Sequence, residues 1–137
     1  MVVFVSNDVK KELQKYKNAL RRYPISRERA IEKYNNMVDA LLSLGNNQAQ
    51  CRPCMYKDLG QKFDSMGNPM FKNLFRYDYK DESKFPWAFA VVIDKIRNTV
   101  TITKMMAASS IKESKDDRIL QAILEFHKRF STIIIKQ

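Results

Sequence analysis

The chain has 137 residues, of which 45% are hydrophobic and 29% are charged, with only 3 glycines and 4 prolines. These values are typical of one globular domain that buries a core without disulfides or a metal, and they argue against a disordered chain. An excess of 25 Lys and Arg over 15 Asp and Glu gives a net charge of +10. This charge favours an anionic partner, nucleic acid first, an acidic protein second and a membrane surface third, and the alternative is a basic surface without a specific partner.

The sequence has no apolar run of transmembrane length and no signal peptide. We therefore expect a cytoplasmic protein with no membrane partner, whose two cysteines are reduced.

The chain is expected to open with a strand and a helix. Residues 2–5 are apolar and rich in valine, and Ser6-Asn7-Asp8 behind them is a cluster typical of a helix start. An apolar stripe at helical spacing follows, and Pro24 ends the helix. The stripe consists of Val9, Leu13, Tyr16 and Leu20.

A second helix is expected between Ser26, its N-cap, and Gly45, its C-cap. Its apolar stripe consists of Ala30, Tyr34, Met37, Val38, Leu41 and Leu44. Because the loop between the helices is short, they should form an antiparallel hairpin. Beyond it, residues 52–59 are expected to contain a short strand, around residues 54–57.

The middle of the chain predicts three consecutive antiparallel strands. Residues 71–79 alternate aromatic with polar side chains, residues 87–96 are almost wholly apolar, and residues 99–103 alternate threonine with valine and isoleucine. Arg97-Asn98 occupies the position of a tight turn, where Asn tolerates the left-handed conformation. The apolar strand should be the covered central one.

The predicted fold class is therefore α+β: a short N-terminal strand that joins the sheet, a two-helix hairpin, an antiparallel sheet of three to four strands, and a C-terminal helix. Residues 1–137 form a single domain, with a helical extension from about residue 111. Asp116-Asp117 should cap the last helix, and residues 133–135, three isoleucines, suggest a strand or a packing arm. The apolar side of that helix holds Ile119, Leu120, Ile123, Phe126, His127 and Phe130.

Cys51 and Cys54 have the spacing of a redox motif. A polar loop precedes them, however, and Pro53 stands directly before Cys54, so the strand-to-helix context of a redox site is missing. A zinc site needs about four ligands, and the only histidine, His127, is distant in sequence. We interpret the cysteines as an ordinary reduced pair and His127 as a boundary residue of its helix.

Alternation along residues 71–79 separates two faces of that strand. Phe71, Phe75, Tyr77 and Tyr79 should face the helices, which leaves Lys72 and Arg76 on an open face. Lys104 falls in the apolar register of the last strand, so the strand either ends there or the lysine emerges at the sheet edge. A basic sheet face with tyrosines nearby suits phosphate binding and base stacking, and a solvated outer face is an equal alternative.

The order of these elements resembles the RelE/ParE superfamily of bacterial toxins from toxin–antitoxin pairs. The opening VVFVSNDVKKELQKY is similar to the usual start of the family, and NLFRYDY with WAFAVVIDKIRNTVTITKMM resembles its strand, strand, turn and strand. The resemblance covers residues 2–106. It implies a toxin that cleaves messenger RNA on the ribosome without a metal or cofactor, with an antitoxin protein as its second partner.

In the ribonuclease branch of this family, basic side chains on the sheet orient the scissile phosphate and the 2′-hydroxyl of the RNA is the nucleophile. The resemblance places Arg76, Lys72 and Lys104 in this catalytic role. The further candidates for nucleic-acid binding are Lys57, Lys62 and Lys84.

Two departures from the ribonuclease pattern keep other functions open. Pro86-Trp87 stands where the next strand of that branch often has arginine, and Met105-Met106 follows Lys104 without the usual basic residue and Tyr or His. One alternative is a non-catalytic relative, either a gyrase poison or a partner-binding module. The other is a basic nucleic-acid-binding protein without toxicity.

Overall fold

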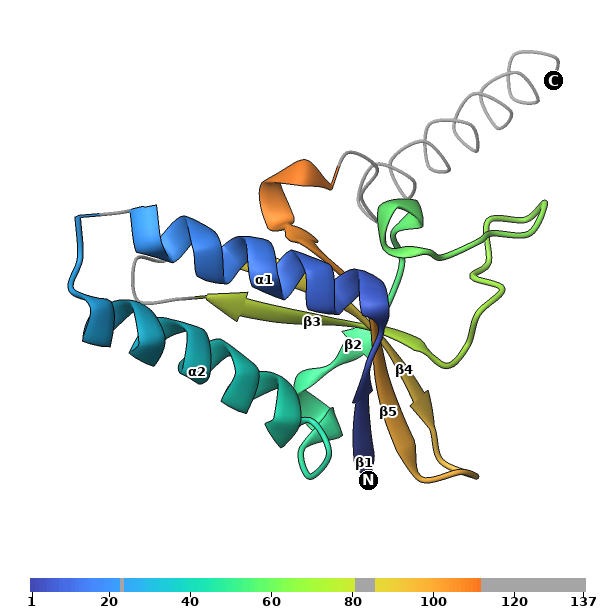
Figure 1. The fold of residues 1–137 in the computed structure, drawn as a ribbon. Helices are drawn as coiled ribbons and strands as arrows, with labels where there is room; N and C mark the ends of the chain where they lie inside the picture. Colours follow the sequence, from blue (N-terminus) through green and yellow to red (C-terminus); the bar gives the residue numbers. More distant parts are fainter. Residues whose placement is uncertain (23, 81–85, 112–137) are drawn as a thin grey trace, which may run out of the picture.

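The computed structural model describes residues 1–22, 24–80 and 86–111. A five-stranded sheet is covered on one face by two helices (Figure 1). In chain order the elements are β1 (Val2–Val5), α1 (Asn7–Arg22), α2 (Arg27–Ser43), β2 (Arg52–Pro53), β3 (Leu74–Lys80), β4 (Pro86–Asp94) and β5 (Thr99–Ala107). Three short 3₁₀ turns, η1 (Gln48–Gln50), η2 (Lys57–Leu59) and η3 (Ala108–Ser110), complete the described part.

The α+β class and the strand–helix–helix opening are confirmed, but the sheet differs from the predicted one. Its strand order is β1-β5-β4-β3-β2, so it has five strands instead of three to four. It is mixed instead of antiparallel, because β1 pairs with β5 in parallel. A short strand forms within residues 52–59, as predicted, but it is β2 at Arg52–Pro53 and not residues 54–57. The predicted C-terminal helix and the arm at residues 133–135 lie outside the described residues.

Both helices begin where their capping residues predict. The Ser6 hydroxyl accepts a hydrogen bond from the Val9 amide at 3.2 Å, and the Ser26 hydroxyl accepts one from the Arg29 amide at 3.1 Å. Each helix then buries its apolar stripe against the sheet. The buried stripe residues are Val9, Leu13, Tyr16, Leu20, Ala30, Met37, Leu41 and Leu44.

The prediction that Gly45 caps α2 is wrong. Leu44 is the C-cap residue, and Gly45 does not have a positive φ. The reason for a glycine here is a close approach, because a Cβ at Gly45 would lie 2.5 Å from the Met1 carbonyl oxygen. The Met1 ammonium group also donates to the Gly45 carbonyl at 2.9 Å, which ties the start of β1 to the end of α2.

The predicted central strand and its turn are confirmed. Four consecutive residues of β4, from position 88 to 91, are 0% exposed, so this strand is covered on both faces. Asn98 has a φ of 57°, as the tight turn requires. One oxygen of Asp94 accepts hydrogen bonds from the Ile96 and Arg97 amides, which closes the turn between β4 and β5.

The sheet has a helix face and a second face, opposite the helices. The helix face carries Tyr77, Phe89, Val91, Val100 and Ile102, as the alternation predicts. The prediction is wrong for Phe71, because this residue lies before the start of β3 and belongs to the second face. The second face was expected to be open, and this expectation is wrong. It holds a smaller apolar cluster made by Cys54, Leu59, Leu74, Ala88 and Ala90, with Tyr56, Val92, Met106, Ala108 and Ile111 packed against it.

A bulge determines where Lys104 lies. Ala90 pairs with Lys104 and Val91 pairs with Ile102, so Thr103 is the extra residue and the alternation shifts after it. Strand β5 therefore continues to Ala107 instead of ending at Lys104. It also lies inside the sheet, between β1 and β4, so neither expectation for Lys104 is correct.

Candidate functional site

Three basic residues lie in one row across four strands of the sheet. Arg52 in β2 is the register partner of Arg76 in β3, Arg76 is the partner of Ala90 in β4, and Ala90 is the partner of Lys104 in β5. Because register partners project to the same side of a sheet, all four side chains belong to the second face. Alanine in the third position leaves the two long basic side chains of Arg76 and Lys104 on either side of a small one.

Arg76 is buried and held by two neighbours. Its Nε and Nη2 atoms lie 3.0 and 2.8 Å from Oδ1 of Asp78, and its guanidinium carbon lies 4.5 Å from the centroid of the Tyr56 ring. The residue is 8% exposed. A buried guanidinium needs such partners, because an uncompensated buried charge costs several kcal/mol.

Asp78 also binds the first arginine of the row. Its Oδ2 atom accepts from Nη2 of Arg52 at 2.8 Å, so the two oxygens of one carboxylate serve two arginines. Two positive charges against one negative charge leave this end of the row cationic. Lys104 adds an exposed ammonium group, which has no ion pair among the described residues.

The structure brings together only some of the predicted basic residues. Arg76 and Lys104 share the row, whereas Lys72 lies in the turn before β3 and not on the strand as predicted. Lys57 and Lys62 are exposed on the segment that precedes β3, and the Lys62 Nζ atom lies 6.0 Å from the centroid of the Phe71 ring. Lys84 lies outside the described residues.

Arg52, Tyr56 and Asp78 were not among the predicted site residues. A signal for Asp78 was present, because residues 76 and 78 lie two positions apart on one strand and so share a face. Arg52 and Tyr56 gave no such signal. Each reaches Arg76 from a segment about 20 residues earlier in the chain, through a two-residue strand and a loop.

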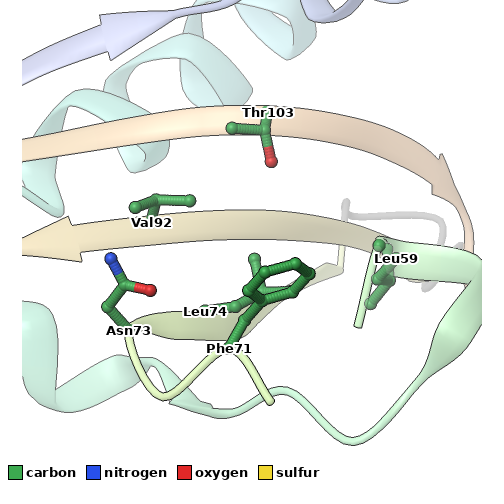
Figure 2. A pocket seen from close by; sticks show the side chains of 7 residues that line it. Leu59, Phe71, Asn73, Leu74, Val92 and Thr103 are labelled. Carbon is green, nitrogen blue, oxygen red and sulfur yellow. The ribbon is translucent and has the colours of Figure 1, made fainter. Parts of the chain in front are cut away.

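An apolar hollow of about 270 Å³ lies on the second face (Figure 2). Thr103, the neighbour of Lys104, lines one side of it, and Asn73, the neighbour of Lys72, lines the other. Two of the predicted phosphate-binding lysines, Lys72 and Lys104, are therefore next in sequence to residues that line the hollow. Its lining consists of Leu59, Gly60, Phe71, Asn73, Leu74, Val92 and Thr103.

A second hollow, of about 290 Å³, lies between the two helices. Three basic side chains, those of Lys17, Arg21 and Arg27, line it together with Ala30, Ile31, Tyr34 and Asn35. The Lys17 Nζ atom lies 5.1 Å from the centroid of the Tyr34 ring. This surface is a second place where an acidic group would be attracted.

The two cysteines are free thiols. Burial raises the pKa of Cys51 to about 11, and burial also raises the pKa of Cys54, against smaller opposing effects of a hydrogen bond to the Tyr56 carbonyl and of the Arg76 charge. Both thiols are therefore protonated at neutral pH, which makes them poor nucleophiles. Within residues 1–22, 24–80 and 86–111, no three His, Cys, Asp or Glu side chains are placed to hold a metal ion.

The row is exposed at its two ends, Arg52 and Lys104, and buried between them. Lys104 is next in sequence to a residue that lines the apolar hollow, and such an arrangement can attract a phosphate with an attached flat apolar group. A scan of the chain against protein-family models finds no match, and a search of curated proteins finds no similar sequence. In the part of the chain that is described, no helix is long and apolar enough to cross a membrane.

Proposed function

We propose that the protein is a RelE/ParE-like toxin that cleaves ribosome-bound messenger RNA in the cytoplasm without a metal. The element order supports this, because the family resemblance implies a strand, two helices and a strand meander, and these elements occur in that order. The net charge of +10 supports a polyanionic substrate. The single observation that carries the proposal is the row that sets Arg76 and Lys104 on either side of Ala90.

The row supplies groups that phosphodiester cleavage needs. The 2′-hydroxyl of the RNA loses its proton to solvent water and attacks the adjacent phosphorus, the P–O5′ bond breaks, and negative charge develops on the phosphoryl and leaving oxygens. Lys104 and Arg76 would offset the charge on the phosphoryl oxygens. Tyr56, in contact with Arg76, would donate a proton to the 5′-oxygen as it leaves.

Induction of the protein in bacteria tests this proposal. We expect growth arrest and new 5′ ends within translated regions of transcripts. Lys104→Ala should abolish both, and Lys10→Ala, which removes an exposed lysine from α1 on the other side of the sheet, should not. Folded protein without arrest and without new ends would contradict the proposal.

The burial of Arg76 favours a second candidate, a non-catalytic relative. An arginine that is 8% exposed and already bound to Asp78 contributes to stability whether or not it meets a substrate. Such a protein would poison gyrase or bind a partner. Induction followed by electrophoresis of chromosomal DNA distinguishes a gyrase poison from a ribonuclease, since a gyrase poison leaves double-strand breaks before any loss of RNA.

A basic nucleic-acid-binding protein without toxicity is the third candidate. The exposed lysines at positions 57, 62, 72 and 104 favour it, because each can neutralise a phosphate without any catalytic group. Binding that weakens steeply with salt, without cleavage and without growth arrest, would favour this candidate.

The proposed protein partner is a cognate antitoxin with an acidic or amphipathic segment. Three cations around the interhelical hollow support an acidic partner, since Lys17, Arg21 and Arg27 form no ion pair with any described residue. Co-expression with the product of the neighbouring reading frame tests this partner. Rescue of growth and co-purification are expected, and the absence of both would remove the antitoxin from the proposal.

A further inference from the structure

The hollow on the second face combines three kinds of groups that a nucleobase requires. Its floor is aliphatic, from Leu59, Leu74 and Val92; the Phe71 ring supplies a stacking surface; and Asn73 and Thr103 supply an amide and a hydroxyl. Figure 2 shows Asn73 and Phe71 on the side of β3, and Thr103 on β5, across β4. None of these groups belongs to the cationic row.

Phe71 is exposed but firmly placed. Phe71 is 41% exposed. Gln61, which is 3% exposed, forms hydrogen bonds with both the backbone amide and the backbone carbonyl of Phe71. The side-chain oxygen of Gln61 accepts a hydrogen bond from the backbone N–H of Phe71 at 2.9 Å. Its side-chain nitrogen donates to the backbone carbonyls of Phe71 and Cys54, each at 2.9 Å. A buried glutamine therefore fixes the backbone that carries an aromatic ring at the rim of a hollow. Such fixed, exposed rings are how proteins bind unpaired bases by stacking.

Asn73 is held by its backbone, while its side chain remains available. Its carbonyl accepts from the Ile93 amide at 3.0 Å. Its side-chain amide forms no hydrogen bond with any residue in the described ranges. A free amide offers one donor and one acceptor side by side, which match the N6 and N7 edge of adenine.

Thr103 adds a second polar group. Its hydroxyl lies 3.4 Å from the Ala90 carbonyl, a long contact that a ligand can replace.

Charge distinguishes a nucleobase from an apolar peptide side chain as the occupant. Lys62 lies 6.0 Å from the centroid of the Phe71 ring, Lys72 is adjacent to both Phe71 and Asn73, and Lys104 is adjacent to Thr103. Lysines next in sequence to residues on both sides of an apolar hollow fit a base with phosphates before and after it. An apolar peptide side chain carries no negative charge and would form no ion pair with these lysines.

We propose that this hollow binds one unstacked base of single-stranded RNA, with Phe71 stacking on it and Asn73 selecting adenine. The inference rests on the proposed action on RNA, and it assigns base selection to residues outside the row that binds phosphate.

Equilibrium binding of short RNAs to the full chain tests the inference. The probes are fluorescent single-stranded oligonucleotides of equal length, oligo(A), oligo(C) and oligo(U), with 2′-O-methyl groups throughout so that they cannot be cleaved. We expect oligo(A) to bind roughly 5-fold or more tightly than the others. Phe71→Ala should weaken binding of all three by roughly 5- to 100-fold, and Asn73→Ala should make the three affinities equal.

Phe4→Ala is the matched control, because Phe4 is also an exposed aromatic residue, at 53%, but belongs to β1 and does not line the hollow. Phe71→Leu keeps an apolar side chain at the rim and checks that the loss is one of stacking rather than of folding.

The outcomes separate the inference from the proposed function. RNA binding without base preference, with Phe71→Ala no weaker than Phe4→Ala, would overturn the inference and leave the proposed function intact. No binding of any RNA at low salt by the folded chain would also overturn the inference, and cleavage on ribosomes would then decide the proposed function separately.

Discussion

Arg76 and Asp78, two residues apart on β3, form a charge pair in which both Nε and Nη2 of the arginine reach the same carboxylate oxygen, at 3.0 and 2.8 Å. The second oxygen of Asp78 binds Arg52. One acidic side chain therefore positions two arginines on the second face. The arrangement of this surface therefore depends on that carboxylate.

Asp78→Ala should destabilise the protein by about 1–3 kcal/mol, because it leaves a buried guanidinium without its main acceptor. Urea denaturation measures the change. Asp39→Ala, which removes an exposed carboxylate from α2, is the control and should cost under about 0.5 kcal/mol. Equal stability of the two variants would show that the arginines do not need Asp78.

Tyr56 is expected to have two separable roles. Tyr56→Phe keeps the ring against Arg76, so stability should change by less than about 0.5 kcal/mol, while RNA cleavage should fall by about 10²–10⁴-fold if the phenol is the proton donor. Tyr56→Leu should also lose about 0.5–2 kcal/mol of stability, because the cation–π contact is gone. Thermal unfolding and cleavage rates of both variants check this. Full cleavage by Tyr56→Phe would remove the phenol from the mechanism.

Much of the fold was predictable because its signals are local. The stripes of both helices, the caps Ser6 and Ser26 and the turn at Asn98 each depend on residues within a few positions of one another. The parallel pairing of β1 with β5 was not predictable in this way. It joins segments almost 100 residues apart, such as Val2 and Thr99, and nothing in either segment specifies the direction of pairing.

The candidate site was predictable only in part, for a related reason. Alternation placed Arg76 on the face away from the helices, and that placement is correct. It could not show that Tyr56 and Leu59, from a loop about 20 residues earlier, cover this face. The bulge at Thr103 moves Lys104 into the row. The alternating threonines of residues 99–103 do not indicate that a bulge occurs there.

Gly45→Ala should destabilise the protein by about 1–3 kcal/mol, since the added Cβ would lie 2.5 Å from the Met1 carbonyl oxygen and force β1 away from α2. Thermal or urea unfolding measures the loss. Asn46→Ala, at the exposed neighbouring position, is the control and should be close to neutral. A stable Gly45→Ala protein would mean that β1 does not depend on this close approach.

Stability should fall at alkaline pH in part because of Cys51. Its pKa rises from 9.0 to about 11 on folding, so the folded state holds the thiol proton more tightly than the unfolded state does. The contribution is fully present below pH 9 and is lost as the pH rises towards 11. Urea unfolding at several pH values should therefore show a shallower decline for Cys51→Ser than for the natural chain. Parallel declines would contradict the burial of this thiol.

The chemistry of the cleaved RNA ends tests the central claim most directly. Ribosomes programmed with a defined message are mixed with the purified protein, and the new ends are analysed. Attack by the 2′-hydroxyl predicts 5′-hydroxyl ends and 2′,3′-cyclic phosphates, with a rate that falls roughly 100-fold in Lys104→Ala and is unchanged in Lys10→Ala. New 5′-phosphate ends, or no cleavage by the folded protein, would contradict the claim.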